Sequence, residues 1–266
     1  MFRKKIVSVI AITLIILCII PISTLAAEKS YVYLSIEKFT IGQGFILEPI
    51  RIEIGTDETV QSLLEKTIDS DKLIIVSSQF GDYLDGFKDD DNSEAVIPKY
   101  ILDEIKNETV GGRAVKGSLL TLDYTSQGGW FYAVNNEAGA VAFGECKLKA
   151  GDVVRIMFSV YGYGTDLGFG FDSKSGKSDA SYIEMPNRDE LIKAVADTQD
   201  EAKKDSALAV LQNLESTKTQ IDGAVKTFSE TTQTPQTADC MLWVFALAIV
   251  VSAVVFKKLR TKIIRF

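Results

Sequence analysis

Two long uncharged segments lie at opposite ends of the chain, so any folded domain must form from the residues between them. The first, residues 6–20, follows three basic residues and gives way to small residues at Ala26 and Ala27. A basic start, an apolar middle and a small-x-small end are typical of a secretory signal peptide. We therefore expect residues 1–26 to be a signal peptide that is cleaved between Ala26 and Ala27. An uncleaved N-terminal anchor is the alternative.

The second segment, residues 240–256, has 17 residues without a charge, and five Lys and Arg residues follow it. As a helix it would measure about 26 Å, slightly less than the hydrocarbon core of a bilayer. A short apolar span followed by cations stops translocation and leaves the tail in the cytoplasm. We expect residues 240–256 to be a transmembrane segment and residues 257–266 a basic cytoplasmic tail. The exported protein would then be held at the cell surface, in wall or membrane, by its C-terminus.

The chain between these segments is strongly acidic. Without the three cations of the signal peptide, and without the five cations and one aspartate after Thr237, the net charge falls from −7 to −14. This charge repels phosphate backbones, so we expect no nucleic-acid partner. Cys146 is the single cysteine in this part, which excludes an internal disulfide and favours a small buried hydrophobe.

The chain has no histidine. This excludes catalytic triads and dyads that contain His, an imidazole general base and His-ligated zinc. No pair of carboxylates stands out with a partner that would shift its pKa. We therefore predict a protein that is not an enzyme and has no catalytic residues, no metal site and no resident cofactor.

Residue patterns between the two ends predict an α+β domain. Alternating apolar and polar residues indicate two strands within residues 31–54, and apolar residues at helical spacing follow in residues 60–68. A short helix is expected at 97–105, and further strands at 73–76, 116–124, 130–134 and 152–161. Two strands, a helix and further strands are the order of a β-grasp-like domain, which we expect over residues 27–171.

A second, helical part is expected after the head domain. Residues 172–186 are rich in Ser, Gly, Lys and Asp and indicate a linker. In residues 187–226, apolar residues recur at 3-4-3-4 spacing from Leu211 to Val225, which is typical of a coiled coil. We expect a helical stalk here, although a helix folded back on the domain fits the narrow stripe as well. Residues 227–239 then form a tether rich in Ser, Thr and Gln.

Several ordered motifs in the head domain resemble a known family. They are KFTIGQGF at 38–45, IPKYI at 97–101, DYTSQGGWFYAVN at 123–135, LKAGDVV at 148–154 and YGYG at 161–164. Together they resemble the transcobalamin-like C-terminal domain family of Gram-positive surface proteins, over residues 31–171. The resemblance implies a β-grasp-like fold and cobalamin as a candidate ligand. The chain departs from the family pattern at Asn136, where Gly is usual, and in the segment that follows up to Cys146.

The tether contains a second motif, Thr234-Pro235-Gln236-Thr237-Ala238. With the apolar span and basic tail behind it, this motif resembles a sortase sorting signal of the Pro-x-Thr type. The resemblance implies that sortase cuts between Thr237 and Ala238 and joins the chain to a cell-wall peptide. Thr234 replaces the usual Leu or Asn, and Ala238 replaces the usual Gly. A membrane anchor that is never cut is the alternative.

Aromatic residues beside glycines are the candidates for ligand binding. Trp130 and Tyr132 share one face of a predicted strand, where they can stack on a flat ligand such as a corrin ring or a sugar. Asn135 ends the same motif, and Tyr161 and Tyr163 form a second aromatic-glycine segment. In the alternative interpretation, Trp130 fills the core with Tyr132 beside it, and the second segment is a strand end that curls over the sheet.

A carboxylate-rich segment, residues 85–94, resembles a calcium loop only superficially. It has several carboxylates, which calcium prefers, but lacks the Gly that an EF-hand loop needs at its sixth position. We expect a solvated loop.

Together these patterns predict a surface-anchored, non-enzymatic binding or adhesion module that contacts a host or wall polymer. Two alternatives stay open. One is capture of a corrinoid or other small ligand by the head domain, and the other is a structural cell-wall spacer.

Overall fold

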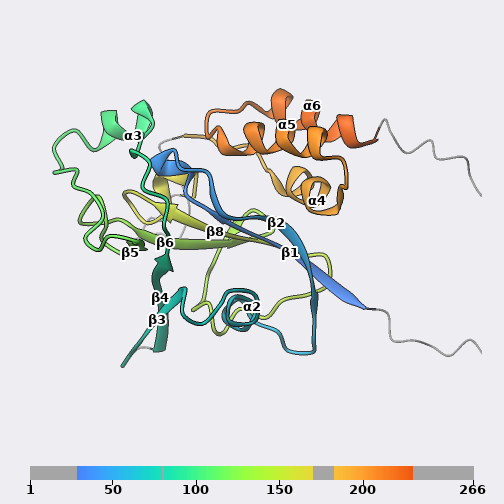
Figure 1. The fold of residues 1–266 in the computed structure, drawn as a ribbon, viewed down its shortest axis with the longest axis horizontal. Helices are drawn as coiled ribbons and strands as arrows, with labels where there is room; N and C mark the ends of the chain where they lie inside the picture. The colour runs from blue at the N-terminus through green and yellow to red at the C-terminus, as the bar shows by residue number, and fades with distance from the viewer. Residues whose placement is uncertain (1–28, 80, 170–182, 230–266) are drawn as a thin grey trace, which may run out of the picture.

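The computed structural model describes residues 29–79, 81–169 and 183–229, which form an α+β fold. A mixed five-stranded sheet lies between two helical layers (Figure 1). Helix α2 (Val60–Thr67) covers one face, and α4 (Asp189–Asp197), α5 (Glu201–Gln212) and α6 (Lys218–Ser229) form the layer on the other. Within the described ranges no helix is long and apolar enough to cross a bilayer. The expected signal peptide, transmembrane segment and sorting motif all lie outside these ranges.

The five strands of the main sheet run in the order β2-β1-β8-β6-β7. Their bounds are β1 Ser30–Glu37, β2 Phe45–Ile54, β6 Gly129–Val134, β7 Glu137–Ala138 and β8 Val153–Ser159. The first two strands form an antiparallel hairpin, and β1 also pairs in parallel with β8. The two strands that are most distant in sequence therefore lie side by side at the centre of the sheet. This pairing confirms the expected α+β class and most of the expected strands.

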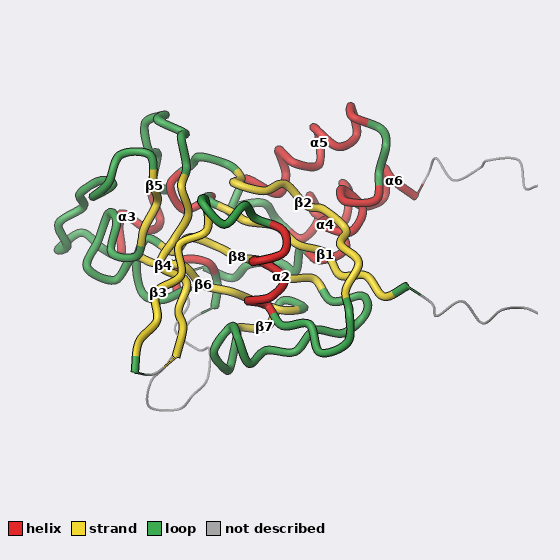
Figure 2. The backbone as a smooth tube through the Cα atoms, turned by 60° about the horizontal axis from the view of Figure 1, so that its bottom comes forward, coloured by secondary structure: helices red, strands yellow, loops and turns green. Residues whose placement is uncertain are grey.

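A second sheet has three strands, β3 (Leu73–Ser78), β4 (Gly81–Lys88) and β5 (Ser118–Leu120). Figure 2 shows the β3–β4 hairpin beside β6, at the end of the molecule away from α6. Sequence patterns missed β4 because its Gly and Asp residues are rare in strands. The strand expected at 116–124 was too long. Leu122 and Tyr124 have φ angles of 67° and 69°, which no strand accommodates, so β5 ends before them.

Alternation along the central strands divides the core between the two faces of the main sheet. Val32, Leu34 and Ile36 on β1 pack against Val60, Leu63 and Leu64 of α2, and all six are buried. Among the described residues, the four core clusters include residues from Val32 to Phe228. A chain of residues 27–233 therefore contains every residue of these cores, and we expect it to fold by itself.

The helical layer differs from the expected stalk. Residues 187–226 do not form one solvated helix; three helices, the last ending at Ser229, fold back on the sheet. Their buried apolar residues join Val153 of β8 in one cluster, with Leu191, Ile192, Val195, Ala207, Leu208, Leu211 and Ile221. Local hydrogen bonds interrupt the helical pattern, because the Asp200 side chain caps α5 and the Asn213 side chain accepts from the backbone of Glu215. Folding back buries apolar side chains that a lone helix would expose.

Charged residues are buried where the helical layer meets the sheet. Arg155 on β8 binds Glu37 on β1 through two hydrogen bonds, of 2.9 Å from Nε and 2.6 Å from Nη2. Arg188, which is 1% exposed, donates to the carbonyl oxygens of Leu211, Asn213 and Leu214 at 3.0–3.2 Å. These carbonyls lie at or just beyond the C-terminal end of α5, where helices leave acceptors without partners. Arg188 therefore ties α5 to the start of α4.

The carboxylate-rich segment is held by buried cations. Lys38 is 1% exposed, and its Nζ lies 2.9 Å from Asp89 and 3.0 Å from Asp91. Arg113 adds a 2.6 Å bond to Asp89. The expected solvated loop is therefore only partly exposed: Asp89 and Asp91 are paired with protein cations, whereas Asp90 and Glu94 are exposed. Asp85 belongs to β4 and not to this loop.

We expect acid to weaken the fold through Asp91. Hydrogen bonds from Ser93, and then the ion pair with Lys38, lower the pKa of Asp91 to about 2. A carboxyl group whose pKa is lower in the folded state contributes stability that is complete above its unfolded pKa of about 3.9 and is lost as the pH falls through the folded pKa. Since Asp91 is partly exposed, the loss should be about 1–2 kcal/mol between about pH 5 and about pH 2. Urea unfolding of the wild type and of Asp91→Asn at several pH values checks this. If the free energy of unfolding falls equally steeply with pH in both proteins, the prediction is wrong.

Candidate ligand-binding groove

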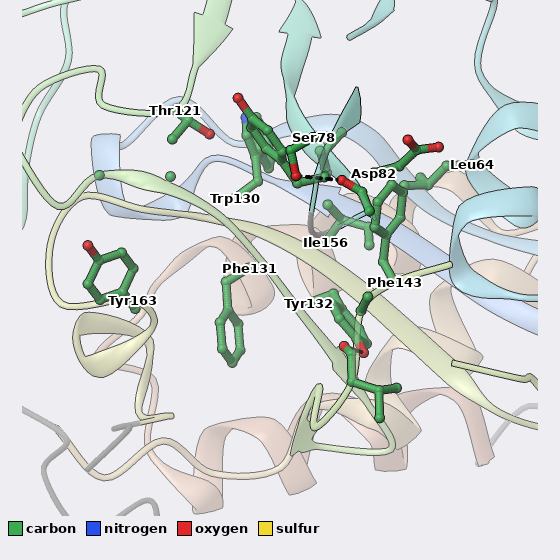
Figure 3. A pocket seen from close by; sticks show the side chains of 17 residues that line it. Leu64, Ser78, Asp82, Thr121, Trp130, Phe131, Tyr132, Phe143, Ile156 and Tyr163 are labelled. Atoms are coloured by element: carbon green, nitrogen blue, oxygen red, sulfur yellow. Dashed lines mark hydrogen bonds between the residues drawn. The ribbon is translucent and has the colours of Figure 1, made fainter. Parts of the chain in front are cut away.

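A groove with a volume of about 510 Å³ lies between the β3–β4 hairpin and strand β6 (Figure 3). Helix α2 contributes one side and the loop after β7 closes the other. Most of the lining side chains are aromatic or aliphatic. The lining residues are Leu64, Ser78, Gly81, Asp82, Tyr83, Leu84, Thr121, Gly128, Gly129, Trp130, Phe131, Tyr132, Val141, Ala142, Phe143, Ile156 and Tyr163.

Trp130 lines the groove and also belongs to the core. Its ring makes edge contacts with Phe87 at 4.7 Å and with Phe158 at 5.4 Å between centroids. Its Nε1–H donates to the carbonyl oxygen of Leu119 at 3.1 Å. Trp130 is half-buried, so the same side chain both fills the core and presents a surface to the groove. Phe131 has its ring on the opposite face of the strand, as alternation predicts, and packs against Phe169.

Tyr132 supports the loop that closes the groove. Its hydroxyl donates to the carbonyl oxygen of Val141, and its own carbonyl accepts from the backbone of Gly139 at 3.0 Å. Burial, with a smaller contribution from Cys146, raises the pKa of Tyr132 to about 12, so its hydroxyl keeps its proton. Cys146 itself is half-buried against the core on the α2 side. Tyr132 is therefore a wall residue whose hydroxyl is already used.

Gly139 lets this loop lie on the Tyr132 ring. A Cβ atom at position 139 would be 2.1 Å from Cζ of that ring. We expect Gly139→Ala to lower the free energy of unfolding by about 1–3 kcal/mol, because the ring or the loop must move. Gly112→Ala is the matched control, since a Cβ there meets nothing within 4 Å. Chemical denaturation of both variants tests this. If both substitutions change the free energy of unfolding equally, the loop moves away from the Tyr132 ring at no cost in stability.

The other three candidate residues are placed differently. Tyr163 lines the open end of the groove and is 63% exposed. Tyr161 lies outside the lining, and its hydroxyl accepts a 2.9 Å bond from Gln127. Asn135 also lies outside the lining, because it binds Asp152 and the backbone of Val153 at 2.8 and 3.0 Å. The structure thus brings Trp130, Tyr132 and Tyr163 together and gives Asn135 a structural contact at a turn.

That turn explains the departure at position 136. Asn135 and Asn136 have φ angles of 53° and 59°, and they connect β6 to β7. A two-residue turn with both angles positive suits Asn as well as Gly, since Asn tolerates the left-handed region better than most residues. The Asn136 backbone therefore adopts the conformation for which glycine is usual.

A buried carboxylate shapes the segment that carries Tyr163. Asp166 is fully buried and accepts hydrogen bonds from the Ser159 hydroxyl and from the Val160 backbone, both at 2.7 Å. Burial raises its pKa to about 7. These bonds close the turn from residue 159 to residue 166 and present Tyr163 at the rim of the groove.

Sequence patterns missed the hairpin side of the groove. Asp82, Tyr83 and Leu84 come from β4, which was not expected to be a strand. Asp82 is exposed and accepts from the Ser77 hydroxyl at 2.6 Å and from Gln61 Nε2 at 3.2 Å. These two bonds lower the pKa of Asp82, so this carboxylate is ionised at neutral pH. The local signal for this wall was weak, because Tyr83 and Leu84 are an adjacent pair between Asp82 and Asp85 and show no alternation.

Comparisons with known proteins add little to this geometry. No protein-family model matches the sequence, and no curated protein matches it. Among solved structures, the chain is similar to a protein of Ruminococcus gnavus that is described as a putative metal binding protein. The TM-score is 0.28 with 12% sequence identity, over 49% of this chain and 97% of that chain. Among the described residues of the present chain, no three His, Cys, Asp or Glu residues are grouped to hold a metal ion.

Proposed function

We propose that this chain is a non-enzymatic binding module of a bacterial cell surface, whose head domain binds a small, largely apolar ligand in the groove. The observation that carries the proposal is the groove itself. Its volume of about 510 Å³ lies within the range of small-molecule sites, and its lining is mainly apolar with a few polar groups. Catalysis at this site has little support, because Asp82 is the single carboxylic acid among the described lining residues and none of the other described lining residues is a Lys, Arg, Cys or His that could act with it.

Strand order supports the finer fold assignment, a β-grasp-like head. In such a fold a hairpin, a crossing helix and a last strand parallel to the first surround one core. The hairpin β1–β2, helix α2 on one face and the parallel pair β1–β8 agree with that arrangement. The sequence resemblance to transcobalamin-like C-terminal domains leads to the same proposal and makes cobalamin and cobinamide the first natural ligands to test.

The position of the groove is compatible with display from a C-terminal anchor. Figure 1 shows the end of α6 at one end of the molecule and the β3–β4 hairpin at the other. Attachment beyond α6, by sortase at Thr237 or by a retained membrane helix, leaves the groove facing away from the point of attachment. This arrangement favours a binding module over a purely structural spacer. We retain adhesion to a host or wall polymer as the alternative for which the same face is the first place to look.

Binding can be followed through Trp130, because a chain of residues 27–233 contains no other tryptophan. We would titrate this chain with Nile red as a neutral apolar probe, and with cobalamin and cobinamide, by fluorescence and calorimetry. Saturable binding at one site is expected for at least Nile red. Absence of saturable binding by all three ligands would overturn the small-ligand proposal and turn attention to adhesion.

A matched pair of variants locates the site. Val141 lines the groove and is 48% exposed, whereas Val115 is 49% exposed and lies outside the lining. We expect Val141→Asp to weaken Nile red binding about tenfold or more, since a charge in an apolar site must be desolvated. Val115→Asp should bind as the wild type does. Equal affinities of the two variants would place the ligand elsewhere.

A further inference from the structure

We propose that the groove selects organic cations, namely ligands that combine an apolar body with an ammonium-type head beside Asp82. This inference rests on the proposed function and names the class of ligand. Three observations carry it, which are the aromatic lining, the unpaired carboxylate at the rim and the absence of basic residues from the lining.

The aromatic lining comes from several separate segments of the chain. Six aromatic residues line the groove, and all but Phe131, whose ring packs against Phe169 on the opposite face of β6, are candidates to face a ligand: Tyr83, Trp130, Tyr132, Phe143 and Tyr163. Figure 3 shows Trp130, Tyr132, Phe143 and Tyr163 at different positions around it. The electron-rich face of an aromatic ring attracts a cation, and sites for quaternary ammonium groups use several such rings together. An anion gains nothing from these faces.

Asp82 supplies the single formal charge among the described lining residues. None of the ion pairs between described residues includes it, and its two hydrogen-bond donors, Ser77 and Gln61, are neutral. Gln61 also donates to Glu65 at 2.8 Å, so the side chain that bridges from Asp82 leads to a second acid and not to a cation. The carboxylate is thus ionised and has no protein cation within ion-pair distance among the described residues.

Among the described residues, the groove lining has no basic side chain. None of its 17 described lining residues is Lys or Arg. The field inside the groove is therefore negative, and this field adds to that of an acidic chain. Complementary charge attracts a cation to such a site and repels an anion of the same shape. A neutral molecule experiences neither the attraction nor the repulsion. A cation with an apolar body satisfies both the carboxylate and the apolar walls.

The test uses three probes that share an eight-carbon chain: octyltrimethylammonium, octyl glucoside and octyl sulfate. Each is titrated below its micelle concentration into the chain of residues 27–233, with Trp130 fluorescence as the readout. We expect the cation to bind about tenfold or more tightly than the anion, with the neutral probe between them. About 0.5 M salt should reduce this ratio, because Asp82 is exposed to solvent.

Asp82→Asn should reduce the ratio of cation to anion affinity to about threefold or less, without changing the affinity of the neutral probe. Asp103→Asn is the matched control, an exposed acid on α3 (Lys99–Glu104) outside the groove lining. Both variants should keep the wild-type unfolding midpoint. If the neutral probe binds but the wild type has a ratio of cation to anion affinity near one, the inference is wrong. It is also wrong if Asp82→Asn leaves that ratio unchanged. Failure of all three probes to bind would overturn the proposed function itself.

Discussion

Replacing Glu37 by leucine should lower the free energy of unfolding by about 3–5 kcal/mol. Glu37 and Arg155 are 2% and 3% exposed, so their ion pair is almost fully removed from water. The variant leaves the Arg155 guanidinium buried without the two hydrogen bonds that it now makes to Glu37. Desolvation of an unpaired charge costs far more than the pair contributes when it is intact. Urea unfolding followed by circular dichroism measures the change.

Two further variants separate this effect from a loss of packing. Glu53→Leu, on the neighbouring strand, breaks an exposed ion pair with Lys29 and should change stability by less than about 0.5 kcal/mol. The double variant Glu37→Leu with Arg155→Met removes both buried charges and should recover most of the lost stability. A double variant that is less stable than Glu37→Leu alone would show that Arg155 contributes mainly through other contacts.

Replacing Arg188 by methionine should cost about 3–4 kcal/mol and loosen the helical layer. The guanidinium now serves three carbonyl oxygens, and its loss removes this donor from the buried Leu211 and Leu214 carbonyls, while the Asn213 carbonyl keeps its bond from the Ser216 backbone. Arg188 is 1% exposed, and this burial, together with the like charge of Arg155, lowers the pKa of its guanidinium to about 10. Denaturation and limited proteolysis of α5 and α6 measure the two consequences.

Lys193 on the same helix provides the control for Arg188. Lys193 makes a partly exposed ion pair with Glu190 one turn away, so Lys193→Met should change stability by less than about 0.5 kcal/mol. Protease resistance of α5 and α6 should then match the wild type. Equal stability of the two variants would show that water replaces Arg188 at these carbonyls.

Secondary structure followed from local pattern wherever a single face is buried. Apolar residues at helical spacing predicted α2, whose Val60, Leu63 and Leu64 are all buried. Alternation predicted β1 and β2, whereas β6 and β8 were expected as strands bounded by turn residues such as Gly128-Gly129, Asn135-Asn136 and Gly151-Asp152. The hairpin strand β4 was not predicted because its Gly and Asp residues are rare in strands, and its pairing with β5 involves a segment about thirty residues later in the chain.

The helical layer shows why a stripe of apolar residues does not determine what covers it. The 3-4-3-4 spacing from Leu211 to Val225 is real, and Leu211 and Ile221 are both buried. Their partners are Val153 of β8 and the residues of α4, not a second copy of the same stripe. Residue spacing indicates that a helix has an apolar face. Whether that face packs against a partner chain or against the same domain depends on tertiary contacts.

The residues of the candidate groove also fall into two groups, those that the sequence predicted and those that it did not. Trp130, Tyr132 and Tyr163 were expected from aromatic residues beside glycines, and all three line it. Asp82 and Val141 were not, because each comes from a segment that reaches the groove only through strand pairing or through the loop on Tyr132. Residue type and spacing, which act over a few positions, determined the class of fold and the aromatic centre of the site. Its walls and its charge were decided by contacts between distant segments, whose approach depends on the packing of the whole core.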